Sequence, residues 1–323
     1  MSEERLWIVC PSYTDVAAFS MLRKRVLDLV RDDPLLDRPV RFVVVDDTAG
    51  CDDEIVQLGA YEDVMVVTPP FNLGHQRAIV CGVRVIEPEL QDSDLVVTMD
   101  SDGEDRPEDL PRLLEQLING AAERNRVCVA WRTKRHESFG FRVMYFFFRI
   151  MFRSLTGVTV RSGNYAAYRG WTARRMLLHP SFDLCYSSTL VSLDLALTRV
   201  PCERGERYAG RSRMSLSRLL MHGVRMLMPF TDRIALRALT AFTATFGLSI
   251  LVSLVVLAIK IFTSSAIPGW ATATLLGILI LSFLALSNAV VLFVVFSESR
   301  GVSLTSLEAQ VERSARSTPA PPD

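Results

Sequence analysis

Two long apolar runs near the C-terminus constrain this chain most. The first, residues 238–262, is interrupted only by Lys260 close to its end, and the second, residues 271–296, contains no formal charge. Each exceeds the roughly 20 residues that an α-helix needs to cross a hydrocarbon core of about 30 Å. The short stretch between them contains Trp270, an aromatic residue suited to a membrane interface. We expect a transmembrane hairpin, and the alternative is a pair of buried core helices.

Charged flanks predict the orientation of this hairpin. Arginines precede the first run and follow the second (Arg233 and Arg237; Arg300, Arg313 and Arg316). The positive-inside rule therefore places both termini in the cytosol. The acidic start of the chain has no signal-peptide pattern, which also favours a cytosolic N-terminal part. Residues 301–323 are expected to form a disordered cytosolic tail.

The first half of the chain alternates apolar strands with helical patterns. We expect strands at 6–10, 41–45, 64–68 and 95–99, and helices at 16–30, 75–86 and 107–117. Such alternation is typical of an α/β fold in which helices cover both faces of a parallel sheet. Ligands of these sheets bind beyond the carboxyl ends of the strands.

An apolar strand runs directly into two carboxylates, Asp100 and Asp102. Alternate residues of an extended chain point the same way, so both side chains can converge on one oxygen-seeking cation such as Mg²⁺ or Mn²⁺. The alternative is that Asp, Ser and Gly stand at this strand end only because they form turns.

Charge and cysteine usage narrow the class of protein. The chain of 323 residues has 36 basic and 36 acidic residues, so its net charge gives no argument for nucleic acid. The charges are nevertheless segregated: residues 92–115 are mainly acidic, and residues 132–237 are basic and rich in Phe, Met and Leu. This mixture favours a membrane surface or an anionic lipid headgroup. The six cysteines form no CxxC pair, which disfavours zinc and indicates small buried side chains in a reducing compartment.

Two segments combine cations with large apolar residues at helical spacing. Residues 139–154 carry three arginines among phenylalanines, and residues 215–230 carry Arg218, His222 and Arg225 in a Leu- and Met-rich pattern. Such helices can lie in the plane of a membrane interface. The alternative is that they pack against the soluble domain.

Further polar motifs follow the other strands: residues 11–15, the pair Asp46–Asp47 and residues 72–78. With Asp100 and Asp102, these motifs resemble, in order and spacing, the inverting GT-A glycosyltransferases of family 2. Residues 207–213 and the paired apolar runs resemble the branch that glycosylates polyprenyl phosphates, which includes dolichol-phosphate mannose synthase and GtrB-like enzymes. The resemblance covers roughly residues 6–300.

The resemblance implies an α/β, Rossmann-like GT-A domain with a C-terminal membrane anchor. Residues 1–135 would bind the nucleotide sugar and the metal, and residues 136–234 would bind the acceptor through interfacial amphipathic helices. Residues 235–300 would form two transmembrane helices, followed by the tail at 301–323. Family members that assemble through their spans make a homo-oligomer compatible with this plan.

The resemblance also assigns roles to single residues. The implied donor-binding residues are Pro11, Tyr13, Asp15, Asp46, Asp47, Asn72, Gly74, Arg77 and Asp100. The implied metal ligands for Mg²⁺ or Mn²⁺ are Asp100, Asp102 and Glu104. The implied acceptor-phosphate residues are Arg132, Arg142, Arg207, Ser212 and Arg213, and Asp102 and Arg132 are the implied catalytic residues.

Each assignment has a simpler alternative. Asp46 and Asp47 also suit a turn at a strand end, and Asn72 with Gly74 suits the start of a helix. Glu104 with Asp105 suits the first turn of a helix that begins near Pro107. The arginines at 204, 207, 211 and 213 also suit a solvated cationic loop.

The implied reaction transfers one hexose, with inversion, from a UDP- or GDP-sugar to undecaprenyl or dolichyl phosphate. A phosphate monoester is already an anion near neutral pH, so a strong general base is not needed. The alternatives are transfer to another lipid such as diacylglycerol, or a non-catalytic membrane adaptor that keeps the fold. A NAD-binding protein is disfavoured because no GxGxxG follows the first strand.

Three departures from the family pattern bear on sugar and acceptor recognition. Asn164 stands where relatives usually show an acid, Phe146 stands where a serine often follows the helix arginine, and residues 182–188 carry few of the charges that often precede the last motifs. The Gln-x-x-Arg-Trp signature of processive synthases is absent, which disfavours polymer synthesis.

Overall fold

The protein is described by a computed structural model. It describes residues 4–119, 126–132, 139–159, 162–193, 195–208, 216–262 and 269–297. The chain divides into two compact units, one formed by Met1–Ile150 with Val158–Pro229 and the other by Met151–Gly157 with Phe230–Asp323.

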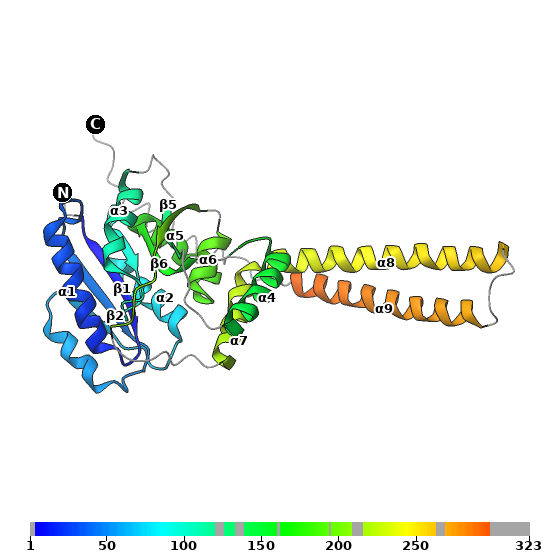
Figure 1. Ribbon diagram of the computed structural model, residues 1–323, viewed down its shortest axis with the longest axis horizontal. Helices are drawn as coiled ribbons and strands as arrows, with labels where there is room; N and C mark the ends of the chain where they lie inside the picture. The colour runs from blue at the N-terminus through cyan, green and yellow to red at the C-terminus, as the bar shows by residue number, and fades with distance from the viewer. Residues whose placement is uncertain are drawn as a thin grey trace. The chain divides into compact units, whose positions relative to one another are not determined.

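A seven-stranded sheet forms the centre of the first unit in the described part of the chain (Figure 1). Its strand order is β3-β2-β1-β4-β6-β5-β7. The bounds are β1 Leu6–Ser12, β2 Val40–Asp46, β3 Val64–Val67, β4 Leu95–Thr98, β5 Arg126–Arg132, β6 Ser162–Arg169 and β7 Ala196–Cys202. Strands β3, β2, β1 and β4 are parallel to one another, whereas β6 is antiparallel to both β4 and β5. The four strands expected from the first half of the chain are parallel, as predicted, and β6, which was not among the expected strands, makes the sheet mixed.

Helices cover both faces of the sheet. One face packs against α1 (Val16–Asp32) and α3 (Leu110–Asn119). The other packs against α2 (His75–Ile86), α5 (Gly170–Leu177) and α6 (Tyr186–Ser192). Short 3₁₀ turns join these elements (η1 Pro34–Leu36, η2 Asp53–Ala60, η3 Glu87–Glu89, η4 Pro107–Asp109 and η5 Pro180–Asp183).

Strand β1 shows why the central strands read as continuous apolar runs. Ile8 and Cys10 belong to the core under α1, while Trp7 and Val9 belong to the core under α2. Because both faces are covered, every position of the strand is buried. Burial of one such aliphatic side chain contributes about 1.5–3 kcal/mol.

Helix α2 approaches the sheet closely at Gly82. A Cβ atom added there would lie 2.5 Å from Cγ1 of Val9 and 2.9 Å from Cγ2 of Val45. Only glycine leaves room for this contact. The close packing fixes the position of α2, whose first residue is His75, at the carboxyl edge of the parallel strands.

At the amino ends of the parallel strands, the buried carboxylate of Asp94 joins neighbouring segments by hydrogen bonds. Asp94 directly precedes β4. Its Oδ1 accepts a hydrogen bond from the backbone N of Arg5 at 3.0 Å. Its Oδ2 accepts from Nε1 of Trp7 and from the backbone N of Gln91, both at 3.0 Å. These bonds join the starts of β1 and β4.

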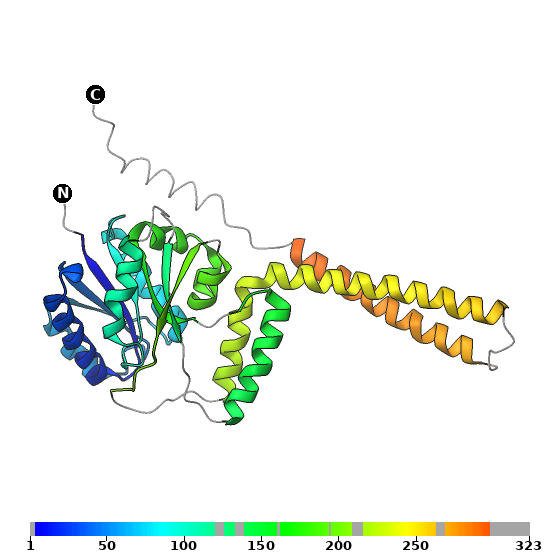
Figure 2. The same cartoon turned by 45° about the horizontal axis from the view of Figure 1, so that its top comes forward.

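Helices α4 (Phe139–Thr156) and α7 (Leu216–Leu227) lie side by side (Figures 1 and 2). A Cβ atom on Gly223 of α7 would lie 3.0 Å from the Phe148 ring of α4. Phe147 of α4 and Met221 of α7 are exposed. The two cationic, apolar segments are thus helices, as expected, and their place at a membrane interface stays a prediction.

The second unit contains two long apolar helices, α8 (Thr231–Phe262) and α9 (Trp270–Ser297), which run side by side (Figure 1). Both are long and apolar enough to cross a membrane. Large apolar side chains such as Leu251 and Phe283 are exposed, while small ones such as Ser249 and Ala285 are buried. Core helices of a soluble protein would hide their large apolar side chains, so the hairpin interpretation is supported.

Candidate active site

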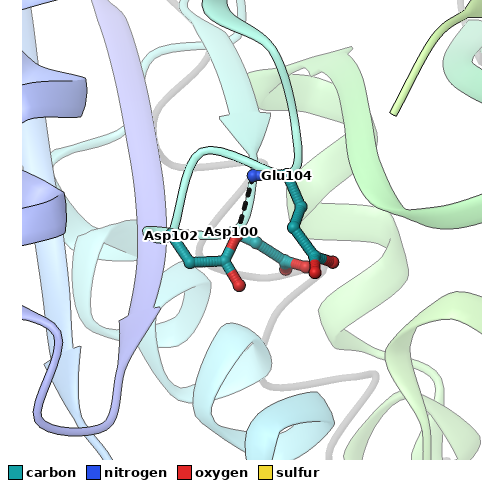
Figure 3. A group of neighbouring side chains, drawn as sticks. All are labelled: Asp100, Asp102 and Glu104. Carbon is teal, nitrogen blue, oxygen red and sulfur yellow. Dashed lines mark hydrogen bonds between the residues drawn. The ribbon is translucent and has the colours of Figure 1, made fainter. Parts of the chain in front are cut away.

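Three carboxylates gather beyond the carboxyl end of β4. One oxygen each of Asp100, Asp102 and Glu104 lies within 4.8 Å of the others (Figure 3). We call these residues the acidic trio. Asp102 is buried, and its Oδ1 accepts the backbone N–H of Glu104 at 2.9 Å. The structure therefore brings together the three predicted metal ligands.

The acidic trio fits a hard divalent cation. It offers only oxygen atoms, the ligands that Mg²⁺ and Mn²⁺ prefer. Burial, followed by the charge of Asp100, raises the pKa of Asp102 to about 6. A carboxyl whose charge is disfavoured by its surroundings is the kind of group that a bound cation stabilises. The role of the trio as metal ligands stays a prediction.

The side chain of Glu104 is not part of the first turn of the helix that follows. Its carboxylate turns to two arginines, with Nε of Arg204 at 3.0 Å and Nε of Arg207 at 3.2 Å. Asp105 accepts the backbone N–H of Asp100 at 3.0 Å and so holds the loop. The alternative that these two acids belong to a helix turn is therefore not supported.

A segment from the acceptor half, residues 203–208, lies along this loop, and we call it the strap. Gly205 N donates to Glu104 O and Tyr208 N donates to Asp102 O, both at 2.9 Å. The Tyr208 ring covers Gly103, whose φ of +89° and lack of a Cβ permit the contact.

The strap brings Arg207 to the acidic trio. Its guanidinium forms ion pairs with Asp102 and Glu104, and Arg204 pairs with Glu104. The alternative of a solvated cationic loop is therefore wrong for Arg204 and Arg207. The predicted contact of Arg207 with an acceptor phosphate stays a prediction.

The predicted donor residues at the ends of β2 and β3 are joined by hydrogen bonds. Oδ1 of Asp47 accepts the backbone N–H groups of Leu73 at 2.7 Å and Gly74 at 2.9 Å. Asn72 donates from its side chain to the backbone oxygen of Asp47. Burial raises the pKa of Asp47, against the two N–H donors that lower it. Gly74 has a φ of +79°, which suits the tight entry into α2.

Two further predicted donor residues have structural contacts. Asp46 is buried, and its oxygens accept the backbone N–H groups of Thr48 and Gly50, each at 3.0 Å. This arrangement matches the turn alternative. The backbone oxygen of Pro11 accepts a hydrogen bond from Oγ of Ser101 at 2.9 Å, which ties the end of β1 to the acidic loop.

The remaining predicted donor residues follow β1 or lie in α2, near the same ends of the parallel strands. Tyr13 follows β1 and is 40% exposed, and Asp15 occupies the N-cap position of α1. Arg77 is exposed on α2, and in the described part of the chain its side chain forms no ion pair. Their contacts with a nucleotide sugar stay predictions.

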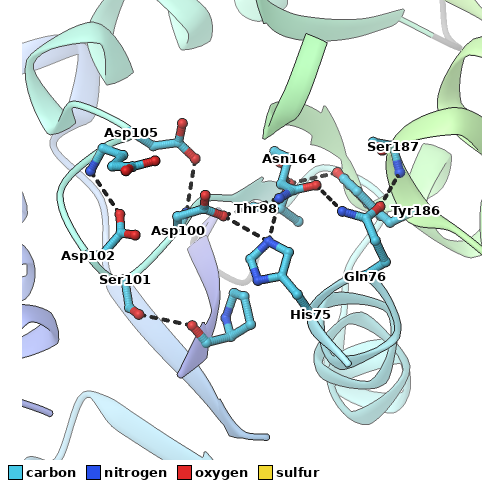
Figure 4. Close-up of polar contacts among 12 residues, drawn as sticks. His75, Gln76, Thr98, Asp100, Ser101, Asp102, Asp105, Asn164, Tyr186 and Ser187 are labelled. Carbon is cyan, nitrogen blue, oxygen red and sulfur yellow. Dashed lines mark hydrogen bonds and ion pairs between the residues drawn. The ribbon is translucent and has the colours of Figure 1, made fainter. Parts of the chain in front are cut away.

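Two residues at the trio were not among the predicted site residues. Nε2 of His75 lies 3.2 Å from Oδ1 of Asp100, and Nδ2 of Asn164 lies 3.3 Å from the same oxygen (Figure 4). Burial alone would lower the pKa of His75, but the charge and hydrogen bond of Asp100 outweigh it and raise this pKa above its usual value. The signals were present in the sequence: His75 lies in the motif at 72–78, and Asn164 replaces a family acid.

Most predicted acceptor residues lie beyond what the structure describes. Arg132 ends β5 and Arg142 lies in α4, but the side chains of both are outside the described set. Ser212 and Arg213 fall outside the described residues altogether. Their roles stay predictions.

Comparisons with known proteins identify the family. Residues 7–170, half of the chain, match the family model "Glycosyl transferase family 2". An undecaprenyl-phosphate 4-deoxy-4-formamido-L-arabinose transferase from Pseudomonas paraeruginosa is 33% identical over 136 residues, which cover 39% of this chain and 37% of the relative. The transferase of the same name from Yersinia enterocolitica is 25% identical and covers 79% of this chain and 76% of its own.

Among solved structures, mannosyl-3-phosphoglycerate synthase from Rubrobacter xylanophilus is similar with a TM-score of 0.48 and 16% identity. The similarity covers 72% of this chain and 74% of that one. It is too distant to indicate a substrate. The two apolar helices and the relatives together indicate an integral membrane protein. With half of its length matched to the family model, including strands β2 to β6 and the acidic trio, the chain belongs to glycosyl transferase family 2.

Proposed function

We propose that the protein is a membrane-bound, inverting glycosyltransferase that moves a single hexose from a UDP- or GDP-sugar to a polyprenyl phosphate such as undecaprenyl or dolichyl phosphate. The acidic trio carries this proposal, because it lies at the carboxyl edge of the sheet in a family 2 chain that also has two apolar helices. The relatives named as undecaprenyl-phosphate transferases support the acceptor class.

The donor half, residues 1–135, provides the groups for a nucleotide sugar. The joined segments at Asp47 and Gly74 offer carboxylate and backbone groups beside the strand ends. Asp100, Asp102 and Glu104 would hold Mg²⁺ or Mn²⁺, which supplies positive charge to the departing nucleoside diphosphate. Asp15 and Arg77 are proposed to contact the donor as well.

The acceptor half, residues 136–234, places cations near the same loop. Arg207 pairs with Asp102 of the trio, and Arg142, Ser212 and Arg213, together with Arg132 from the end of the donor half, are proposed to join it in binding the lipid phosphate. Guanidinium groups bind phosphate bidentately. The phosphate oxygen attacks the anomeric carbon without a strong base, because it is already anionic near neutral pH.

The membrane parts complete the proposal. Helices α4 and α7 would lie at the interface with their exposed apolar side chains in lipid. Helices α8 and α9, which contain the two spans predicted within residues 235–300, would anchor the chain with both termini in the cytosol, as the flanking arginines indicate.

The test is transfer by the full-length protein in detergent with Mn²⁺ and radiolabelled UDP- and GDP-sugars. Undecaprenyl phosphate, dolichyl phosphate and diacylglycerol serve as parallel acceptors, and Asp102→Asn is the inactive control. We expect a labelled product only with a polyprenyl phosphate. Product with diacylglycerol alone would favour the other lipid acceptor, and no product with any donor would favour a non-catalytic adaptor.

A further inference from the structure

A buried glutamine sets the direction of a chain of amides that leads to the acidic trio. Oε1 of Gln76 accepts the backbone N–H of Ser187 at 2.9 Å. A backbone N–H can only donate, so this oxygen must face Ser187 and the Gln76 amide nitrogen must face the other way. The orientation of the Gln76 side chain is therefore determined by its partner, which removes the usual ambiguity of amide groups.

The next group in the chain is Asn164. Nε2 of Gln76 donates to Oδ1 of Asn164, so Nδ2 of Asn164 must face away from Gln76. That nitrogen lies 3.3 Å from Oδ1 of Asp100 and beside Nε2 of His75 (Figure 4). The series Ser187, Gln76 and Asn164, which we call the amide relay, thus ends in an N–H donor directed at a carboxylate of the trio.

The sheet holds Asn164 in this place. Strands β4 and β6 are antiparallel with Thr98 opposite Ala166, and continuing that register by two residues brings Asn164 opposite Asp100. Oγ1 of Thr98 donates to the backbone oxygen of Asn164 at 2.6 Å, and the hydroxyl of Tyr186 lies 2.6 Å from the same Oγ1. Asn164 is 9% exposed, so its amide has little access to water as an alternative partner.

The chemistry of the site explains why an amide suits position 164. Three carboxylates already lie together in the acidic trio, so a further carboxylate beside Asp100 would add to their mutual repulsion. Asn164 supplies a donor without charge, and its oxygen satisfies Gln76 on the other side. An apolar residue could do neither.

We propose that Asn164 is a positioning residue that holds Asp100 in the orientation in which it shares a cation with Asp102 and Glu104, and that Gln76 imposes this orientation through the amide relay. The inference rests on the proposed function, in which the acidic trio binds Mg²⁺ or Mn²⁺. Hydrogen-bond partners of metal ligands typically change metal affinity by about 10- to 100-fold when they are lost.

The test measures Mn²⁺ affinity of the purified full-length protein by calorimetry, with no nucleotide and no lipid present. Gln76→Glu keeps the shape and can accept from Ser187, but as a carboxylate it cannot donate to Asn164, whose amide would turn and present an oxygen to Asp100. We expect about tenfold weaker Mn²⁺ binding. Gln76→Met removes the hydrogen bonds to Ser187 and Asn164 without forcing the wrong orientation, so its loss of Mn²⁺ affinity should be smaller.

A double-mutant cycle separates orientation from packing and charge. In an Asn164→Leu background the amide is gone, so Gln76→Glu should cause less additional loss than it does in the wild-type protein. Val85→Glu adds a carboxylate to an exposed position near the other end of α2 and should leave Mn²⁺ affinity unchanged. Thermal unfolding of each variant reports on the fold, and Gln76→Met carries the test if Gln76→Glu does not fold.

Several outcomes would overturn the inference. These are equal Mn²⁺ affinities for the wild type and a folded Gln76→Glu, equal losses for Glu and Met at position 76, or no Mn²⁺ binding by the wild-type protein. Sugar transfer to polyprenyl phosphate is measured separately. A protein that transfers sugar normally but fails these tests would refute the role of Asn164 and leave the proposed function intact.

Discussion

Buried acids stand at both ends of strand β4, and the two ends differ in how the negative charge is compensated. Asp94, just before the strand, accepts three N–H donors, from Arg5, Trp7 and Gln91, and it also pairs with the Arg5 guanidinium at 3.4 Å. Asp102, just after the strand, accepts one backbone N–H, pairs with Arg207, and lies among two further carboxylates.

The comparison distinguishes a buried charge that supports the fold from a buried charge that is suited to binding a ligand. A buried carboxylate with a full set of donors stabilises the fold, whereas crowded carboxylates destabilise it unless a ligand compensates them. Burial and Asp100 raise the pKa of Asp102 to about 6, which is the electrostatic cost of this crowding. We therefore expect stability to depend on Asp94 and activity to depend on Asp102.

The largest effect should follow from Asp102→Asn. Loss of one charged ligand should lower sugar transfer at least about 100-fold, because the metal provides several kcal/mol of charge stabilisation. The unfolding midpoint should stay at or above that of the wild type, since a crowded charge is removed. Radiolabel transfer and thermal unfolding measure the two quantities. Normal transfer by this variant would break the comparison.

Asp94→Asn should show the opposite pattern. The new amide places an N–H group among N–H donors, so the free energy of unfolding should fall by about 2–4 kcal/mol. Mn²⁺ affinity of the folded protein should stay within about twofold of the wild type, because the site lies at the other end of the strand. Chemical denaturation and calorimetry check this. Weaker Mn²⁺ binding without a loss of stability would contradict it.

Arg207→Gln should change Mn²⁺ affinity and sugar transfer in opposite directions. Removal of the guanidinium frees Asp102 and Glu104, so Mn²⁺ affinity should rise severalfold. Transfer should nevertheless fall about tenfold, the effect of one charge-assisted hydrogen bond of about 1.4 kcal/mol to the acceptor phosphate. Arg204→Gln is the matched control, because Arg204 pairs with Glu104 in the same trio. Equal effects of the two variants on transfer would argue against the acceptor role of Arg207.

A pH titration should give an effect no larger than that of Arg207→Gln. Because the pKa of Asp102 is about 6, protons compete with Mn²⁺ below that pH, and affinity should fall about tenfold between pH 7 and pH 5. Without metal, the contribution of Asp102 to the stability of the fold changes with pH in the direction opposite to the Mn²⁺ affinity. The folded protein binds more protons at Asp102 than the unfolded chain between about pH 4 and pH 6, so this carboxyl contributes stability at low pH that is lost as the pH rises through 6. Asp94→Asn should keep both dependences, and a flat affinity profile would count against a buried, crowded Asp102.

The sequence pattern predicted the parallel half of the sheet well, and for a physical reason. Helix α2 was expected at residues 75–86 and has these bounds, because apolar residues at helical spacing face a buried sheet. Asp100 and Asp102 were expected to converge because strand geometry alone brings alternate residues together. The mixture of strand directions could not be predicted in this way, since alternation of apolar and polar residues carries no information about direction.

Contacts between elements that are distant in the sequence explain why Asn164 and His75 were not predicted to lie at the trio. Asn164 reaches Asp100 only because β6 is antiparallel to β4, and His75 reaches it only because α2 packs closely at Gly82. The contact of Arg207 with the trio depends on backbone bonds of the strap, which no local pattern encodes. Tertiary pairing, not local propensity, decides these positions.

Because β6 runs antiparallel to β4, its first residues lie beside the acidic loop, and substitutions there can change the chemistry of the site. Asn164 stands at the rim, and the small side chains of Ala166 and Ala167 further along the same strand fill the interior on the two faces. An exchange at position 164 changes the hydrogen bonds to Gln76 and Asp100 but not the apolar contacts of these two alanines. A lineage of such proteins could therefore diversify its reactions by changing the first residues of one strand while the architecture beneath them is inherited unchanged.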